Sequence, residues 1–117
     1  MIYKSKELPS FMRIKYLKDM EAKNKLHYIR VNKKVAGFYV LDGSMFKCLY
    51  IEPKYRGANL ASVIIKDTCK KQKITIATLV KRNCCIKHII KKLGFTPTGI
   101  IVQGKQSLLE IWESPSL

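Results

Sequence analysis

The segment from Met45 to Ala61, MFKCLYIEPKYRGANLA, restricts the possible folds more than any other part of this sequence. It opens with a largely apolar run typical of a β-strand, which Pro53 ends because proline has no N–H to give to a sheet. Gly57 relieves the backbone in the basic turn that follows. The segment therefore predicts a strand, a turn over residues 52–58 and then a helix. That helix is indicated by residues that recur at helical spacing, namely Leu60, Val63, Ile64 and Thr68.

The turn at the start of this helix has the chemistry of an anion-binding site. The first N–H groups of a helix have no partner inside the helix, and the helix dipole places partial positive charge at the same end. Phosphate and pyrophosphate groups bind at such ends. Because Arg56 adds a cation to the turn, we expect the segment to bind a phosphate-containing ligand.

The same turn resembles the acetyl-CoA-binding turn of the GNAT superfamily of N-acetyltransferases, which has the form Q/R-x-x-G-x-G/A. Arg56 and Ala61 match its first and last positions. Asn59 stands where the family usually has glycine. Asparagine accepts unusual backbone dihedrals better than most residues and can cap a helix, so we expect the turn to tolerate it.

A second segment, residues 83–95, resembles a later helix of the same family, which reads N-x-x-A, then a tyrosine, then L-G-F. Asn83 and the ending Leu93-Gly94-Phe95 match this pattern, whereas Ile86 and Ile90 replace the alanine and the tyrosine. The two motifs occur in the expected order and spacing. The resemblance covers roughly residues 35–112.

The resemblance implies an α/β (α+β) fold, a GNAT-like mixed and mostly antiparallel central sheet of about six to seven strands with helices on both faces and a splayed cofactor cleft. Residues 1–117 would form a single domain. Apolar periodicity and turn residues predict the elements themselves. Helices are expected over residues 7–22, 60–71 and 85–93, strands over 26–31, 35–41, 45–51, 74–80, 95–103 and 108–113, and a frayed tail from residue 114.

The resemblance also implies acetyl-CoA, or another acyl-CoA, as the cofactor. Backbone groups near Leu49 and Ile51 would bind the pantetheine arm. The pyrophosphate would lie on backbone amides of the turn, contributed by Arg56, Gly57, Ala58, Asn59, Leu60 and Ala61. Asn83 is expected either to touch the cofactor arm or to cap its own helix.

The catalytic residue is left open by the sequence. Acetyl transfer needs a neutral amine, a polarised thioester carbonyl and a proton for the leaving thiolate. The family often uses a tyrosine as the acid, and Ile90, which stands there, cannot donate a proton. Tyr50 and Tyr39 lie on strands expected to border the cleft, although both can equally be packing residues. Cys85 follows basic residues at a helix start, which can lower the pKa of a thiol, but it can also be a buried apolar residue.

The net charge of +15 indicates an anionic neighbour, such as nucleic acid, a nucleoprotein or an acidic protein. A biased, lysine-rich composition explains the same number, because the chain has only four arginines. The four cysteines show no zinc-binding spacing, so we expect no metal site, reduced thiols and a cytoplasmic protein. No segment predicts a membrane span, and both a monomer and a homodimer remain open.

The leading hypothesis is therefore an acetyl-CoA-dependent N-acetyltransferase that transfers an acyl group to an amine by direct attack in a ternary complex. The acceptor would be a macromolecule or another anionic target. The alternatives are a catalytically inactive GNAT-like module that binds nucleic acid or a partner protein through its basic surface, and an acyltransferase that modifies nucleic acid itself.

Overall fold

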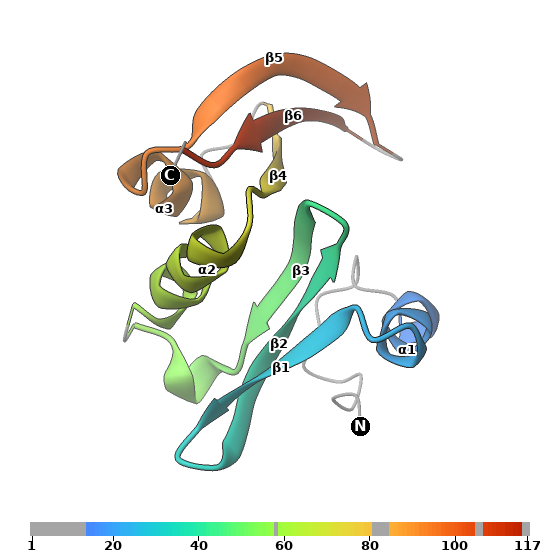
Figure 1. The fold of residues 1–117 in the computed structure, drawn as a ribbon, viewed down its shortest axis with the longest axis vertical. Coiled ribbons are helices and arrows are strands. Elements are labelled where there is room, and N and C mark those ends of the chain that lie inside the picture. The colour runs from blue at the N-terminus through green and yellow to red at the C-terminus, as the bar shows by residue number, and fades with distance from the viewer. Residues whose placement is uncertain (1–13, 58, 81–84, 105–106, 116–117) are drawn as a thin grey trace. The chain divides into compact units, whose positions relative to one another are not determined.

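The computed structural model describes residues 14–57, 59–80, 85–104 and 107–115 (Figure 1). The chain divides into two compact units, Met1–Arg56 and Gly57–Leu117. Each unit contains three strands joined as antiparallel pairs. The predicted mixed α/β architecture with a mostly antiparallel set of six strands is confirmed.

The first unit is a helix followed by an antiparallel meander. It contains α1 (Ile14–Ala22), β1 (Leu26–Val31), β2 (Lys34–Asp42), β3 (Met45–Ile51) and the short 3₁₀ helix η2 (Pro53–Tyr55). The predicted bounds of β1 and β3 are confirmed, and β2 is one residue longer at each end. The predicted end of the first helix at residue 22 is also confirmed, whereas its predicted start lies outside the described residues.

Two tight turns fix the register of this meander. Val31 pairs with Lys34 across a two-residue turn in which Asn32 and Lys33 have φ of 50° and 69°. Positive φ at both central residues is the geometry of a type I′ turn, whose twist matches that of the strands. The second turn begins at Gly43, where φ is 62°.

The core of the first unit forms where α1 packs on the meander. Leu17 and Phe38 are fully buried in it. A close approach of two backbones lies beside this core, because a Cβ built on Gly37 would lie only 2.1 Å from the carbonyl oxygen of Tyr50. Glycine is therefore required at this position of β2. The buried core cluster consists of Leu17, Met20, Leu26, Phe38, Val40 and Tyr50.

The second unit alternates helices and strands. It contains α2 (Leu60–Lys71), β4 (Thr75–Leu79), α3 (Cys85–Lys92), β5 (Thr96–Gln103) and β6 (Leu108–Glu113). β6 lies between β4 and β5 and is antiparallel to both. Gly94, at φ of 90°, follows α3 and ends it as predicted.

Side-chain contacts hold α3 against the sheet of the second unit. Lys87 on α3 forms an ion pair with Glu110 of β6, and Lys91 lies over the ring of Trp112. The indole of Trp112 in turn donates a hydrogen bond of 2.9 Å to the hydroxyl of Thr78 on β4. This chain of contacts connects α3, β6 and β4 across one face of the sheet.

Two features of the second unit add to or correct the sequence analysis. Val63 is among the residues whose helical spacing indicated α2, but its side chain is 49% exposed, whereas Ile65 is fully buried. Residues two positions apart in a helix lie about 200° apart around its axis, so a helix that buries Ile65 directs Val63 toward solvent. The frayed tail does not begin at Ser114, which is buried and exchanges two hydrogen bonds with the backbone of Ile74.

None of the helices in the described part of the chain is long and apolar enough to cross a lipid bilayer.

Candidate cofactor-binding site

A β-bulge interrupts β3 just before the predicted cofactor turn. Tyr50 pairs with Phe38, but the next regular pair is Lys47 with Val40, so two residues of β3 face Tyr39 alone. Those two residues are Cys48 and Leu49, and Cys48 has φ of 56°. Because a bulge leaves one residue out of the ladder and bends the strand, backbone groups of β3 become available to a ligand here. Leu49, predicted to bind the pantetheine arm, is one of the two bulged residues.

Arg56 is folded back on the end of β3. Its Nε donates a hydrogen bond of 2.7 Å to the carbonyl oxygen of Ile51, and its guanidinium carbon lies 5.5 Å from the centre of the Tyr50 ring. Backbone groups near Ile51 were predicted to bind the cofactor arm, and one of them, the carbonyl of Ile51, has Arg56 as its partner. Since a guanidinium carries five N–H donors, this bond fixes the position of the cation and leaves further donors for an anion.

The turn after Arg56 uses two left-handed residues to enter α2. Gly57 has φ of 90°, and Asn59 has φ of 57° and ψ of 23°. The expectation that Asn59 adopts dihedrals that favour glycine is confirmed. Asn59 occupies the N-cap position, but its side chain makes no capping hydrogen bond, so its expected capping role is absent. Ala58 lies outside the described residues.

The start of α2 has the backbone geometry expected of an anion site. The first hydrogen bond of the helix runs from the amide of Val63 to the carbonyl of Asn59 at 3.1 Å. The amides of Leu60 and Ala61 precede this bond, and helix geometry gives them no partner within α2. The helix is 12 residues long, so the aligned peptide dipoles of several turns add up to partial positive charge at its N-terminus.

The catalytic candidates have different surroundings. Tyr50 is 3% exposed and belongs to the core cluster of the first unit. Tyr39 is half-buried and stacks between His27 and Phe46, at ring distances of 5.1 and 4.9 Å. Both rings therefore have the packing role that the sequence left as the alternative to catalysis.

The remaining positions of the second motif lie on α3 or in residues 81–84, which are outside the described residues. Asn83 lies outside the described residues, and so does the side chain of Cys85. Ile90, at the position where the family often has its tyrosine, is fully buried. His88, on the same helix, is exposed.

Two other thiols are half-buried and are free cysteines. Burial raises the pKa of Cys48, and it raises the pKa of Cys69 in the same way. A raised pKa keeps both thiols protonated near neutral pH, which makes them poor nucleophiles. No group of three or more metal-binding side chains comes together in the described residues.

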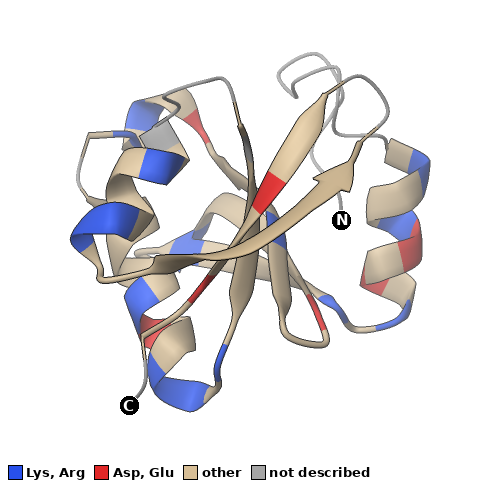
Figure 2. Cartoon of the chain, turned by 90° about the horizontal axis from the view of Figure 1, so that it is seen from above, with Lys and Arg blue, Asp and Glu red and all other residues tan. Residues whose placement is uncertain are grey.

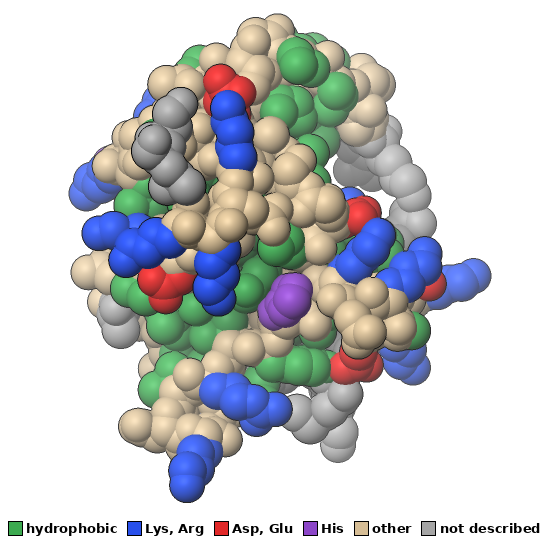
Figure 3. All heavy atoms as spheres, viewed as in Figure 1, with side chains coloured by type: hydrophobic (Ala, Val, Ile, Leu, Met, Phe, Trp, Pro, Cys, Tyr) green, Lys and Arg blue, Asp and Glu red, His purple; other side chains and the backbone are tan. Residues whose placement is uncertain are grey.

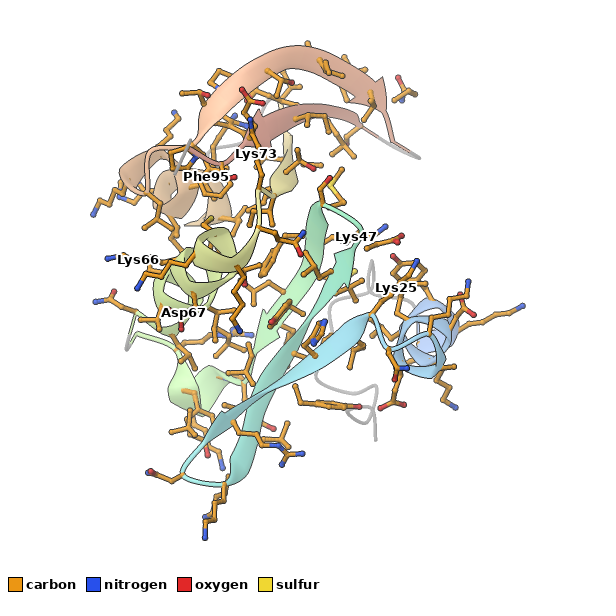
Figure 4. The ribbon with its side chains drawn as sticks, viewed as in Figure 1. Lys25, Lys47, Lys66, Asp67, Lys73 and Phe95 are labelled. Atoms are coloured by element: carbon orange, nitrogen blue, oxygen red, sulfur yellow. The ribbon has the colours of Figure 1, made fainter. Side chains whose placement is uncertain are left out.

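Among the residues that the structure describes, most lysines and arginines lie on the helices and turns (Figure 2). One acidic residue balances part of it in the first unit, where Asp42 accepts a hydrogen bond of 2.6 Å from Lys25 and lies 3.7 Å from Lys47. Both lysines lie at the same end of the meander (Figure 4). The hydrogen bond from Lys25 holds the pKa of Asp42 below its ordinary value.

An ion pair between a buried lysine and a half-buried glutamate in the second unit was missed at the sequence level. The Nζ of Lys87 lies 3.6 Å from Glu110 and 3.3 Å from the carbonyl oxygen of Val80, just after β4. Lys87 is 8% exposed. The signal was present in the sequence, because Lys87 stands within the apolar stripe of its helix and Glu110 is the one acid inside the apolar run LLEIW.

Comparisons with known proteins were made on sequence and on structure. No protein-family model matches the sequence, and no curated protein sequence matches it significantly. Among solved structures, a GNAT-family acetyltransferase from Bacillus cereus matches with a TM-score of 0.69 and 18% identity, over 88% of this chain and 78% of that one. The chain has the GNAT fold.

Two further GNAT-fold neighbours were solved with ligands that contain CoA. Arabidopsis thaliana Naa50, in complex with the bisubstrate analogue CoA-Ac-MVNAL, matches with a TM-score of 0.62 and 20% identity, over 90% of this chain and 82% of that one. The NatC complex bound to Gag peptide and CoA matches with a TM-score of 0.66 and 14% identity, over 97% and 84%. The GNAT-like fold predicted from two short motifs is therefore confirmed.

Proposed function

We propose that this protein is an acyl-CoA-dependent N-acyltransferase, with acetyl-CoA as its cofactor. The observation that carries the proposal is the left-handed turn at Gly57 and Asn59, which leads from the basic residue Arg56 into the N-terminus of α2. The GNAT fold supports this reading, because neighbours with that fold were solved with CoA-containing ligands.

In this proposal the main chain holds most of the cofactor. The amides of Leu60 and Ala61, at the start of α2, bind the pyrophosphate. Arg56, whose guanidinium is held by its bond to Ile51, supplies a cation just before this turn in the sequence. Bulged backbone near Leu49 on β3 binds the pantetheine arm. Because backbone amides are present whatever the side chain, such a site tolerates the departure of Asn59 from the family pattern.

The reaction is direct transfer between bound partners. The nitrogen of a neutral amine attacks the thioester carbonyl carbon, a C–N bond forms and the C–S bond breaks, and the amine loses a proton while the CoA thiolate gains one. Ile90 cannot supply that proton, so a solvent-connected water or another side chain must carry it. The positive net charge favours an acceptor on an anionic target over a polyamine. A cytoplasmic location stays a prediction.

The sharpest test of the cofactor site is Asn59→Asp. Aspartate also adopts left-handed dihedrals, and a carboxylate at the N-cap of α2 stabilises the helix. The same carboxylate repels a pyrophosphate, so we expect unchanged or higher thermal stability together with an acetyl-CoA dissociation constant raised about tenfold, or about 1.4 kcal/mol. Isothermal titration calorimetry at moderate and high salt measures the affinity, and thermal unfolding measures the stability.

Asn32→Asp is the matched control, because Asn32 is exposed, has φ of 50° and lies in the β1–β2 turn. It makes the same change of net charge away from α2 and should leave the affinity within twofold of that of the unmodified protein. Equal weakening by both variants would reduce the effect to overall charge. The absence of acetyl-CoA binding by the unmodified protein would overturn the proposal.

The fully buried Ile90 favours one second candidate, a GNAT-fold binding module without catalysis. Such a module binds nucleic acid or a partner protein through its basic surface. An acyltransferase that modifies nucleic acid combines both properties. Assays of CoA release with amine, peptide and RNA acceptors separate them, because a module releases no CoA. Its affinity for nucleic acid should fall steeply as salt rises.

A further inference from the structure

β5 forms one edge of the sheet in the second unit. It pairs with β6 on one side, and the strand order of the described residues ends with β5 on the other. In an antiparallel strand, alternate residues direct their N–H and C=O groups to opposite sides. β5 pairs regularly with β6 from Ile101 to Gln103, so about half of the backbone groups of these residues point to the open edge, where they can pair with another strand. The amide of Ile100 is instead bonded to the hydroxyl of Thr98 at 3.1 Å.

The side chains of this half of β5 are apolar and uncovered. Ile100 is 57% exposed, Ile101 54% and Val102 40%. Ile101 pairs with Glu110 and shares its face of the sheet, whereas Ile100 and Val102 lie on the opposite face. Both faces of the edge are therefore open. Figure 3 shows hydrophobic side chains gathered over the β5–β6 hairpin, where Leu108 is also 46% exposed.

This edge lacks the features that usually prevent strand pairing. Lysines, prolines and bulges protect natural edges. The first half of β5 has Pro97 and an irregular register from Pro97 to Ile101, with Gly99 at φ of 85°, but residues 101–103 pair regularly with β6 and include no lysine or proline. By contrast β1, an edge strand of the first unit, carries Arg30 and a bulge.

The edge is also the least charged part of a strongly basic chain. Residues 93–104 are the longest stretch without a lysine, arginine, aspartate or glutamate, although the net charge is +15. β5 is accordingly neither blue nor red in Figure 2. An acidic protein or a nucleic acid would find no cation on this strand to pair with. A second copy of the chain, repelled by the lysines elsewhere, meets no like charge on it.

We propose that residues 101–103 of β5 are a self-association surface, on which the same segment of a second copy pairs antiparallel, with the exposed side chain of Ile100 beside it. Antiparallel pairing of identical segments is self-complementary about a twofold axis, so each copy offers the same residues to the other. The apolar side chains of both faces then cover one another across the new pair of strands. The proposal does not depend on the proposed acyltransferase activity.

The expected association is weak because the paired segment is short. Standard stable interfaces bury about 1,600 Å² in total, and this short edge contributes only part of that area. We expect a monomer–dimer equilibrium with a dissociation constant on the order of 10–100 μM. High salt should strengthen it, because salt screens the repulsion between the two cationic copies.

The test is analytical ultracentrifugation of the full chain over a range of concentrations, at moderate and high salt, for two variants that add the same charge. Ile101→Lys places an ammonium group on the open edge and should weaken the dimer at least tenfold. Val63→Lys is the matched control, because Val63 is 49% exposed on α2 of the same unit, and it should leave the dissociation constant unchanged. Circular dichroism establishes that both variants are folded.

Hydrogen–deuterium exchange of the unmodified protein gives a second measurement that needs no variant. The amides of the segment 101–103 should become more protected as protein concentration rises, while those of α2 do not change. A protein that stays monomeric at millimolar concentration overturns the proposal, and so does a dimer that Ile101→Lys leaves intact. Equal weakening by Val63→Lys, or protection elsewhere than on β5, overturns it as well.

Discussion

Replacement of Gly37 by alanine should be the most damaging single-methyl change in the first unit. A Cβ at this position would lie 2.1 Å from the carbonyl oxygen of Tyr50, whereas real Cβ atoms essentially never approach closer than 3.0 Å. The obstacle is backbone and cannot rotate away, so β3 must move from β2 by roughly 1 Å in a tightly packed core. That movement disturbs the pairing of Gly37 with Ile51 and the bond from the amide of Glu52 to Ala36.

The expected cost is about 3–4 kcal/mol of unfolding free energy. Overpacking contributes about 1–3 kcal/mol, and each weakened hydrogen bond adds about 1 kcal/mol. Urea unfolding followed by far-UV circular dichroism measures the loss, with an unchanged m-value as the sign that the same surface unfolds.

Gly43→Ala is the control for the glycine change itself. Gly43 has φ of 62° and open space around a built Cβ, so only backbone strain of about 1 kcal/mol is expected there. If Gly37→Ala lost no more stability than Gly43→Ala, the close approach of β2 and β3 would not restrict this position and the reasoning would be refuted.

Three further predictions follow from individual contacts. Lys87→Met leaves Glu110, whose side chain is 25% exposed, without its ion pair and should cost about 2–3 kcal/mol in urea unfolding; the double variant with Glu110→Leu should recover most of this, and no recovery would contradict the pairing. The pKa of Asp42 is lower in the folded protein than in the unfolded chain, so the unfolded chain binds its proton more readily. The contribution of Asp42 to the unfolding free energy is therefore complete above the unfolded pKa near 4 and is lost as pH falls below it. Asp42→Asn should therefore flatten the acid limb of a stability-versus-pH curve, and an unchanged limb would contradict it. Asn59→Val forces a β-branched residue to φ of 57° and should cost about 1–3 kcal/mol, whereas Asn59→Gly should be neutral in the same thermal unfolding assay.

The sequence predicted the local elements well where one signal decided them. The strand bounds at Leu26–Val31 and Met45–Ile51 were confirmed because turn residues flank both strands. The GNAT fold was predicted from the turn at Arg56 and the ending at Gly94, since short motifs with special backbone requirements survive at low identity.

The sequence could not predict features that depend on contacts between distant residues. The inward side of α2 is decided by packing, and both Val63 and Ile65 are apolar, so spacing alone does not show that Ile65 is buried and Val63 exposed. The bulge at Cys48 depends on the register between β2 and β3, and no residue of β3 indicates that register in the sequence. Ser114 looks like part of a polar tail and is fixed only by its partner Ile74, 40 residues earlier.

The bonds between Ser114 and Ile74 give the end of the chain a role in the middle of its sequence. The amide of Ile74 and its carbonyl, at the entry to β4, are both satisfied by this one serine. A chain cut before Ser114 would keep the sequence of every strand. The N–H and C=O groups of Ile74 would then lack their protein partner, and β4 would lose the two hydrogen bonds at its start. The ribosome makes β4 well before it makes Ser114. This strand therefore cannot form all of its hydrogen bonds until translation has reached Ser114.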